Sequence, residues 1–326
     1  MWKKIRPYAQ GCYRLLDTAN GFLYDFIRFF KYGGWPGKLS DKAQRDYGLI
    51  MRYHGLEKSL SYKERNPSAG WRNAFDTLSF IEAAHLHGEI GPVDVAAVKV
   101  LEKFISLPGN EKDIRSKNIK ERLKVINAEV GEDHGAIDYS HLDFLRGMLQ
   151  SPEDFFFSRY SLREFKDKAV SKSVIERAVS LAMKTPSVCN RQAWAVYNAS
   201  EKMVRDVVLS HQNGNKPFGD KVPNVLVVAA DLRAFFTGRE HYQHWIDGGL
   251  FSMSLMYAFH SLGLATCPLN WSQTPAMDKS LRSKLCIKDS HTIIMVIAVG
   301  YPDEHNKVCV SARRSLSEVV FDLKLK

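Results

Sequence analysis

Two runs of consecutive apolar residues in the second half of the chain constrain its fold most. They read NVLVVAADL (224–232) and TIIMVIAVG (292–300). Continuous apolar runs of this length are typical of strands buried on both faces of a sheet. Helical patterns flank them, among them SKSVIERAVSLAMKT (171–185), which Ser171 would cap. The alternation predicts an α+β or α/β sheet covered by helices on both faces.

The first half of the chain has only helical patterns. Four segments have this character: residues 41–60, 77–88, 92–107 and 111–130. Ser40 or Asp41 would cap the first of these helices, and Asp76 would begin the second. An acidic stretch without periodicity, GEDHGAIDYSHLDF (131–144), predicts a linker. We therefore expect a helical N-terminal region over residues 1–150, of unknown role, and a second domain over residues 151–326.

Residues 1–40 carry half of the net charge of +10, because seven basic residues face two acidic ones (7 − 2 = +5). Apolar side chains recur there every three or four residues, which predicts an amphipathic helix. Gly11, Gly21 and the stretch YGGWPG (32–37) are expected to break or end it. The helix would pack on its own protein or on a partner subunit, and peripheral contact with a membrane surface is the alternative. Nucleic acid is not expected as a partner.

Several classes of protein are disfavoured. The five cysteines are scattered and odd in number, which argues against a disulfide framework or a zinc site and favours a reducing cytoplasm. His54 and Glu57 stand three apart but have no second pair nearby, so we expect no metal. We find no run of about 18 apolar residues and no secretory signal, so a cytoplasmic protein is expected. The GxGxxG, GxxxxGK[ST], GxSxG and HExxH motifs do not occur.

Two arginine clusters stand out among the polar residues. SRYSLREF (158–165) places Arg159, Ser161 and Arg163 at every second position, so that an extended segment would turn all three to one side. Guanidinium groups give forked, charge-assisted hydrogen bonds that suit a phosphate. SARRSL (311–316) contains Arg313 and Arg314, which could form a second set of phosphate-binding residues.

The C-terminal half resembles the FMN-dependent nitroreductase family through five motifs in the family's order. They are SRYSLREF (158–165), TPSVCNRQAW (185–194), WIDGGLFSMSLMYAFHSLGLATCPL (245–269), IAVGYP (297–302) and SARRSLSEVV (311–320). The resemblance implies an α+β fold, with a central sheet flanked by helices and a helical N-terminal region before it. MRYHGLEKSLSY (51–62) is similar to extended nitroreductase-like proteins associated with bacterial surface polysaccharide synthesis.

The resemblance also implies which residues bind FMN. Those for the phosphate and ribityl groups are Arg159, Tyr160 through its backbone, Ser161, Arg163 and Arg313. Those for the ring and its surroundings are Pro186, Ser187, Asn190, Gln192, Pro268, Leu269 and Asn270, with Trp194 packing behind. An amide at the pyrimidine edge would come from Gln212, Asn213 or Asn215. Asn270 and Trp271 stand where the family usually has small residues, so we expect them to add bulk over the ring.

The activity implied is that of an FMN-dependent oxidoreductase, an obligate homodimer that passes electrons from NADH or NADPH through the flavin to a small acceptor. The cofactor carries the chemistry, so no catalytic side chain is assigned. His241, Tyr242 and His244 are candidates for a proton donor, although a solvated helix start is preferred. Two alternatives stay open: a flavin oxidase or dehalogenase, and a flavin-binding docking or scaffold protein at the membrane surface with little turnover.

Overall fold

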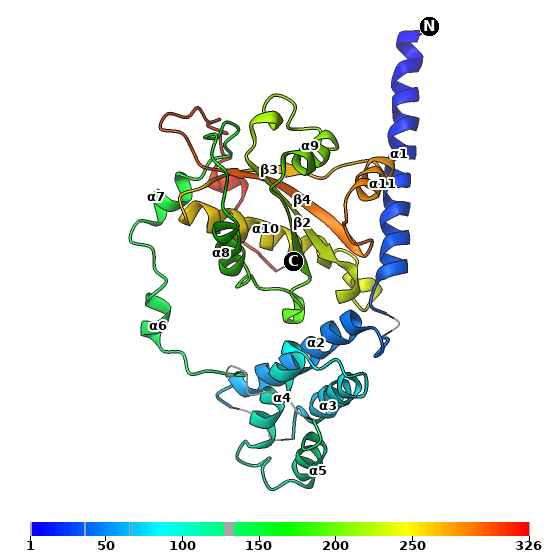
Figure 1. Ribbon diagram of the computed structural model, residues 1–326, viewed down its shortest axis with the longest axis vertical. Coiled ribbons are helices and arrows are strands. Elements are labelled where there is room, and N and C mark those ends of the chain that lie inside the picture. The colour runs from blue at the N-terminus through cyan, green and yellow to red at the C-terminus, as the bar shows by residue number, and fades with distance from the viewer. Residues whose placement is uncertain (1, 36, 65, 67, 127–133, 326) are drawn as a thin grey trace.

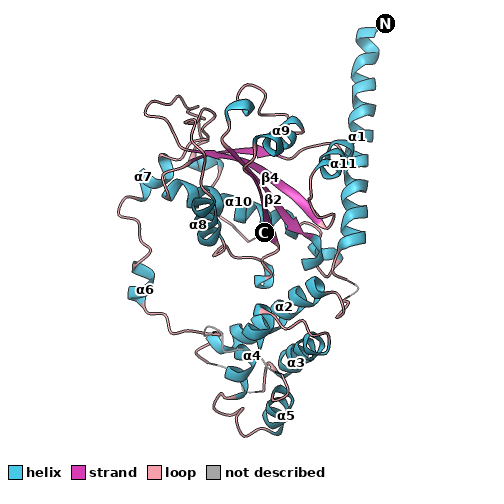
Figure 2. Ribbon diagram, viewed as in Figure 1, coloured by secondary structure: helices cyan, strands magenta, loops and turns pink. Residues whose placement is uncertain are grey.

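The computed structural model describes residues 2–325 except 36, 65, 67 and 127–133, and side-chain burial from residue 10 onwards. Figure 1 shows two bodies, a helical one and one built on a sheet, with a long helix beside the second. Figure 2 shows that the strands lie only in the second body. The predicted α+β class, with a helical N-terminal region before a sheet flanked by helices, is confirmed.

The sheet has four antiparallel strands in the order β1-β2-β4-β3. Their bounds are β1 (Trp194–Ala199), β2 (Asn224–Asp231), β3 (Ala265–Asn270) and β4 (His291–Gly300). The two apolar runs form the central strands β2 and β4, and every residue of β2 is buried. Side chains alternate along a strand, so Val225 and Val227 join one core while Leu226 and Val228 join the other.

Helices cover both faces of the sheet. The core around Val225 includes residues of α9 (Lys202–Ser210) and α11 (Pro275–Lys284), and the core around Leu226 includes residues of α8 (Lys172–Ala182) and α10 (Gln243–Ser261). Ser171 caps α8, as predicted, because its hydroxyl accepts a hydrogen bond from the Val174 N–H. Burial of each strand face against a helix explains why these strands have no polar side.

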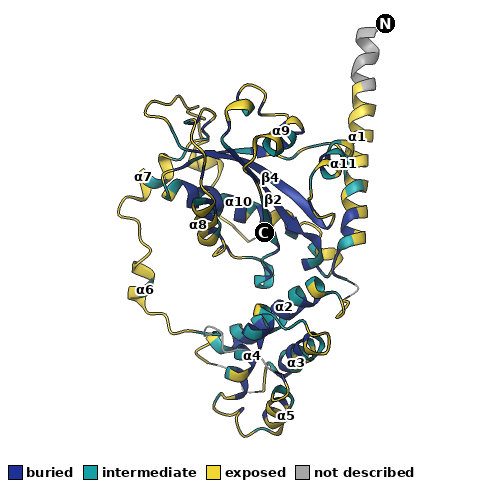
Figure 3. Cartoon of the chain, viewed as in Figure 1, coloured by how far each residue is buried: buried dark blue, intermediate teal, exposed yellow. Residues whose placement is uncertain are grey.

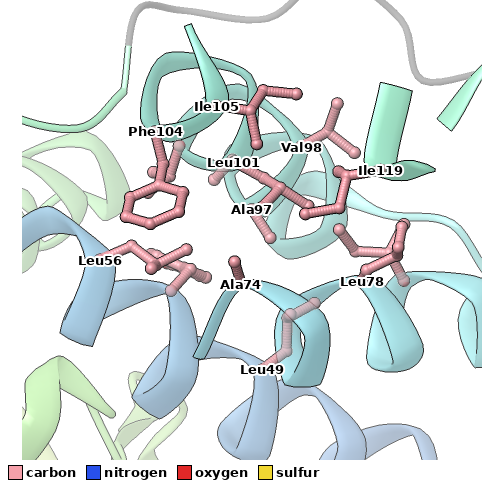
Figure 4. Close-up of a cluster of buried hydrophobic side chains, with 14 of the residues drawn as sticks. Leu49, Leu56, Ala74, Leu78, Ala97, Val98, Leu101, Phe104, Ile105 and Ile119 are labelled. Atoms are coloured by element: carbon pink, nitrogen blue, oxygen red, sulfur yellow. The ribbon is translucent and has the colours of Figure 1, made fainter. Parts of the chain in front are cut away.

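The helical body consists of α2 (Lys42–Ser61), α3 (Trp71–Leu86), α4 (Pro92–Ile105) and α5 (Ile114–Leu123). Figure 4 shows its core, in which Leu56, Leu78, Leu101 and Phe104 meet. Asp41 caps α2, as predicted, by accepting from the Gln44 N–H. The prediction that Asp76 begins a helix is wrong, because α3 begins five residues earlier, at Trp71, after Gly70 in a left-handed conformation. Part of the predicted linker forms α6 (His141–Leu145), and α7 (Pro152–Phe157) follows; residues 131–133 lie outside the described residues.

Helix α1 (Trp2–Tyr32) is longer than the sequence predicts. It runs through Gly11 and Gly21 without a break and ends before Gly33, so only the second part of that prediction is right. Its last turns lie on the sheet domain, where Phe29 joins a small core with Ala193, Leu232 and Phe235. Its first half projects beyond the rest of the molecule (Figure 1). The end of α1 therefore contacts the domain that begins beyond residue 150.

Candidate functional site

The basic segment 158–163 lies in an extended conformation against the edge strand β3. Ser161 forms a parallel bridge with Thr266, and the Leu162 N–H donates to the Thr266 carbonyl at 3.1 Å. Leu162 is buried in the sheet core, whereas Arg163 is exposed. The alternation thus leaves Ser161 and Arg163 on the side away from the core, in the predicted arrangement.

Both guanidinium groups of this segment act on the same part of β3. Burial raises the pKa of the Cys267 thiol, while the positive charges of Arg163 and Arg159 act to lower it. Arg163 Nη1 also lies 3.6 Å from Cys309 Sγ. Because positive charge stabilises an anion nearby, this edge of the sheet is suited to a phosphate group.

A cavity of about 340 Å³ opens beside this segment. Arg159 and Tyr160 line it together with His260, Thr266 and Asn306. His260 is held at its wall, because its Nε2 lies 2.9 Å from Ser158 Oγ and 3.0 Å from the Phe155 carbonyl oxygen. The cavity size is that of a small-molecule site.

The end of β3 holds three further predicted residues. Leu269 is buried in the sheet core, so only its backbone faces outward, while Asn270 is exposed. Pro268, which precedes both, is half-buried. The Trp271 indole donates to Asp278 Oδ1 at 2.9 Å, so a contact with α11 orients this ring. That Trp271 adds bulk over a flavin stays a prediction.

The three candidate amides near residue 212 have different partners. Gln212 is buried and its Nε2 donates to the Asn270 carbonyl oxygen at 3.2 Å, which brings it to the end of β3. Asn215 is buried and donates to the carbonyl oxygens of Leu209 and Gln212, so its amide closes the turn. Asn213 Nδ2 lies 3.4 Å from Gln273 Oε1 at the surface. Gln212 is therefore the amide nearest to the other predicted residues of β3.

The loop 186–192 adopts an unusual backbone conformation. Cys189, Asn190 and Gln192 have φ values of 50°, 54° and 51°, in the left-handed region that non-glycine residues rarely occupy. Ser187 Oγ accepts from the Gln192 N–H at 3.0 Å, and Gln192 Nε2 donates to the Asn190 carbonyl oxygen at 3.1 Å. Pro186 is exposed at the start of the loop. Beyond the loop, the Trp194 ring stacks on the Phe251 ring, with 4.8 Å between the ring centroids. Such strain persists only where the surroundings fix the backbone.

Arg191, which sequence reasoning did not single out, fixes this loop. Its side chain is fully buried and donates to the Val188 and Ala234 carbonyl oxygens and to the carboxylate of Glu240, the last at 2.5 Å. Burial tends to raise the pKa of Glu240, but the bond from Arg191 lowers it overall. Asp247, at the start of α10, accepts from the Val188 N–H at 3.2 Å. No sequence signal separates a buried arginine in a polar loop from a solvated one.

The structure does not bring the two groups of predicted residues together within one chain. The loop 186–192 precedes β1 and the segment 158–163 lies on β3, at opposite edges of the sheet. Three strand spacings give about 14 Å across the sheet, and the register from Thr292 to Val299 adds about 23 Å along it. Arg313 joins neither group: it is exposed and its guanidinium contacts the Ser311 carbonyl oxygen.

The three candidates for a proton donor also separate. His244 is buried beside Phe29 and Phe235, and burial lowers its pKa to about 4. A neutral histidine in an apolar pocket is a poor acid, so His244 is not a proton donor at the surface. His241 and Tyr242 are both exposed in the turn before α10. This turn agrees with the preferred expectation of a solvated helix start.

The residues that the structure describes contain no group of three or more His, Cys, Asp or Glu side chains able to hold a metal ion. His54 instead contacts Glu57 on its own helix at 2.9 Å. No helix within the described ranges is both long and apolar enough to cross a membrane.

The α+β sheet domain, with a basic segment on one edge strand and a polar loop before the other, defines the class of protein, and comparison with known proteins finds a family that matches it. Residues 157–208 and 198–301 match the model of the nitroreductase family. The C-terminal half of the chain thus carries the match to this family, whose proteins it resembles. The match leaves out the helical body and the whole of α1.

Two curated relatives cover the same part of the chain. A protein of Archaeoglobus fulgidus, named as an NADH dehydrogenase/NAD(P)H nitroreductase, is 28% identical over 153 residues, which are 45% of this chain and 83% of the relative. An iodotyrosine deiodinase of Haliscomenobacter hydrossis is 25% identical over 178 residues, 46% of this chain and 78% of the relative. Among solved structures, an FMN-dependent nitroreductase of Clostridium difficile R20291 is 21% identical, with a TM-score of 0.45 over 52% of this chain and 98% of that one.

Proposed function

We propose that this chain is an FMN-dependent oxidoreductase that passes electrons from NADH or NADPH to a small-molecule acceptor. The observation that carries the proposal is the basic segment beside β3, in which Ser161 pairs with Thr266 and the charges of Arg159 and Arg163 act on neighbouring Cys267. A phosphate needs such a set of cationic and hydroxyl donors. The match to the nitroreductase family and the names of the relatives support the same reading.

The residues present fit FMN when two copies of the chain are combined. The segment on β3, with Pro268, Asn270 and Gln212, would hold the phosphate, the ribityl group and one side of the ring. The loop with Pro186, Ser187, Asn190 and Gln192 lies too far away in the same chain to reach the same ring. We therefore propose a homodimer in which the loop of one copy completes the site of the other. Arg313, exposed in a tail without core contacts, would close on the phosphate in that assembly.

Bound FMN would supply the redox chemistry by accepting a hydride and releasing the electrons to an acceptor. The chain's own groups bind and orient it. Arg159 and Arg163 neutralise the phosphate, and the hydroxyl of Ser187 and the amides of Asn190 and Gln192 present hydrogen-bonding groups on a backbone that Arg191 keeps fixed. Preorganised polar groups cost no rearrangement when the ligand binds. No side chain needs to act as acid, base or nucleophile, and we assign none.

We place the FMN-binding domain at residues 151–326, with residues 1–150 as a helical extension. The segments α2, 188–190 and 232–234 pack on one another, so the extension supports the loop 186–192. A cytoplasmic location stays a prediction.

A dehalogenase is the second candidate for the reaction, and its specific support is the deiodinase relative. It keeps the flavin and the same donor residues and changes only the acceptor. Turnover of a halogenated tyrosine compared with that of a nitroaromatic compound, under anaerobic conditions, separates the two.

The first test is an anaerobic visible spectrum of the purified protein before and after addition of NADH or NADPH. We expect a flavin spectrum that bleaches with at least one donor. Flavin that stays oxidised with both donors would favour the docking or scaffold function with little turnover. Protein that lacks flavin and does not take up added FMN would contradict the proposal.

A further inference from the structure

A second cavity, whose lining contains none of the proposed flavin residues, lies where α1 passes α11. Its volume is about 380 Å³, and its walls carry four cationic side chains, two from each helix: Arg28, Lys31, Lys279 and Arg282. Tyr24, Ile27, Tyr32, Ser283 and Asp289 complete the lining. One carboxylate, that of Asp289, faces these four positive charges within the lining.

The four cations differ in how far they are already engaged. Arg282 is held by Asp278, with Nε to Oδ2 at 2.7 Å, and by the carbonyl oxygens of Lys288 and His291. Arg28 donates through Nη2 to the carbonyl oxygens of Asp289 and His291 at 2.8 and 2.9 Å. These bonds fix the two guanidinium groups at the base of the cavity. The backbone carbonyls orient Arg28 without cancelling its charge.

Lys31 and Lys279 are exposed at the rim. Lys31 Nζ lies 4.8 Å from the centre of the Tyr32 ring, and Lys279 Nζ lies 5.4 Å from that of Tyr24. Contact with an aromatic face positions an ammonium group but leaves its charge uncompensated. A cavity with fixed guanidinium groups below and two positioned ammonium groups above is suited to a phosphate.

An apolar stripe on α1 begins at the same cavity. Besides Tyr13, seven large apolar side chains described on this helix, from residue 10 onwards, are more than half exposed: Leu15, Leu16, Phe22, Leu23, Phe26, Ile27 and Phe30. Ile27 belongs both to the stripe and to the wall of the cavity. The spacing of three, four and seven residues places the stripe on one side of the helix, while Tyr24, Arg28 and Phe29 face the domain. Figure 3 shows the exposed surface that runs along α1.

We propose that the cavity binds the phosphate headgroup of an anionic phospholipid, with the α1 stripe lying in the membrane interface. Charge complementarity selects this occupant. A protein partner that covered only the stripe would leave the cationic cavity without counter-charges, whereas an anionic lipid surface supplies phosphate and acyl chains together. The site goes beyond the proposed redox function and gives residues 10–32 a binding role independent of the flavin.

Binding of the full-length protein to vesicles tests the proposal. The vesicles are phosphatidylcholine alone or phosphatidylcholine with phosphatidylglycerol, and the bound fraction is measured by co-sedimentation. We expect binding to the anionic vesicles only. The double substitution Lys31→Gln/Lys279→Gln should weaken it about 25-fold, because each lysine at an anionic surface accounts for roughly fivefold in binding. The matched control is Lys172→Gln/Lys202→Gln, which removes two exposed charges on α8 and α9 and should leave binding nearly unchanged.

The stripe is tested with Leu23→Ser/Phe26→Ser, which should also lower binding to the anionic vesicles. Its control is Leu181→Ser/Met203→Ser, two exposed apolar residues on other helices. Circular dichroism melting and the flavin spectrum of each variant show that the fold is kept, and they report on the redox proposal separately.

Three results would overturn the lipid site. One is equal binding to both kinds of vesicle, or binding that the Lys31/Lys279 variant retains. Another is pyrophosphate binding in calorimetry that this variant loses, without vesicle binding, which would assign the cavity to a soluble phosphate ligand. The third is a stripe variant that changes the molar mass in light scattering but not vesicle binding, which would show that a second copy covers α1.

Discussion

The two halves of the proposed flavin site differ in how much of their geometry one chain fixes. The loop 186–192 has its backbone held by Arg191, Glu240 and Asp247, and a small apolar core lies behind it. On the other side, Arg163 is exposed on an edge strand, and residues 303–325 of the C-terminal tail are exposed throughout. Folding therefore completes the first half, whereas the second half keeps its side chains available for a ligand or another copy.

This difference teaches where the function should be sensitive to mutation. Changes behind the loop should act on stability first and on flavin binding through it. Changes in the basic segment should act on flavin binding alone. Separate measurements of the free energy of unfolding and of FMN affinity tell the two classes apart.

The largest effect is expected from Arg191→Met. This substitution leaves Glu240 without its partner in a place where the arginine side chain is fully buried and the glutamate is 22% exposed. Loss of one member of such a pair costs about 3–5 kcal/mol of unfolding free energy. Urea denaturation measures it. The control is Arg122→Met, whose pair with Glu82 is exposed by 41% and 34% and should cost at most about 1 kcal/mol. Equal costs in the two variants would show that Arg191 does not hold the loop.

His244 gives a pH dependence to the core behind the loop. Burial, with smaller contributions from the charges of Arg28 and His241, lowers its pKa from 6.5 to about 4. The folded state then binds fewer protons than the unfolded state between these values. The contribution of neutral His244 to the free energy of unfolding is fully present above about pH 6.5 and is lost as the pH falls towards 4. The loss lowers the free energy of unfolding by about 3 kcal/mol.

The variant His244→Phe should flatten the stability curve between pH 6.5 and 4. The Nδ1 atom of His244 is buried without a hydrogen-bond partner, so an apolar ring suits the pocket beside Phe29. Denaturation at a series of pH values measures the slope, and the exposed-turn variant His241→Phe is the control. If the free energy of unfolding of His244→Phe depended on pH as steeply as that of the wild type, the pH-sensitive group would lie elsewhere. The contact between α1 and the core behind the loop would then not be the origin of the pH dependence.

Arg163→Gln tests the open half of the site. An exposed side chain contributes little to stability, so the free energy of unfolding should stay within about 0.5 kcal/mol of that of the wild type. The FMN dissociation constant should rise about 10- to 100-fold, since a hydrogen bond to a charged group contributes about 1.5–3 kcal/mol. Quenching of FMN fluorescence by the apoprotein measures it, with Arg177→Gln on α8 as the control. A change below twofold would remove Arg163 from the site.

The sequence predicted what depends on local pattern and missed what depends on distant contacts. The runs 224–232 and 292–300 predicted the central strands because burial on both faces leaves no polar position. Every-second-residue spacing placed Ser161 and Arg163 on one side of an extended segment, as the structure has them. The role of Arg191 went unrecognised because its partner, Glu240, is brought to it by the packing of other elements. The contact of Trp271 with Asp278 depends on packing in the same way.

The length of α1 was missed for a related reason. Glycine lowers helix propensity by about 1 kcal/mol, which made Gly11 and Gly21 natural break points. Beyond Gly21, tertiary contacts anchor the helix on the sheet domain, through Tyr24 to Asp278 at 2.7 Å and Arg28 to two backbone carbonyls. They do not reach Gly11, and nothing in the structure explains why the helix continues through that residue. Propensity alone does not contain these contacts.

Two glycines of this region give the smallest expected effects, and these have opposite signs. A Cβ atom on Gly34 would lie 2.4 Å from the Arg233 carbonyl oxygen and 2.8 Å from the Phe236 ring, so Gly34→Ala should cost about 1–3 kcal/mol. Gly21 has open space around it within α1, so Gly21→Ala should add about 0.5–1 kcal/mol. Thermal unfolding measures both. Gly21→Ala could instead raise helicity in circular dichroism without raising the melting temperature. That result would show that α1 folds independently of the domain and does not support the loop 186–192. The two halves of the flavin site would then differ less in stability than their contacts indicate.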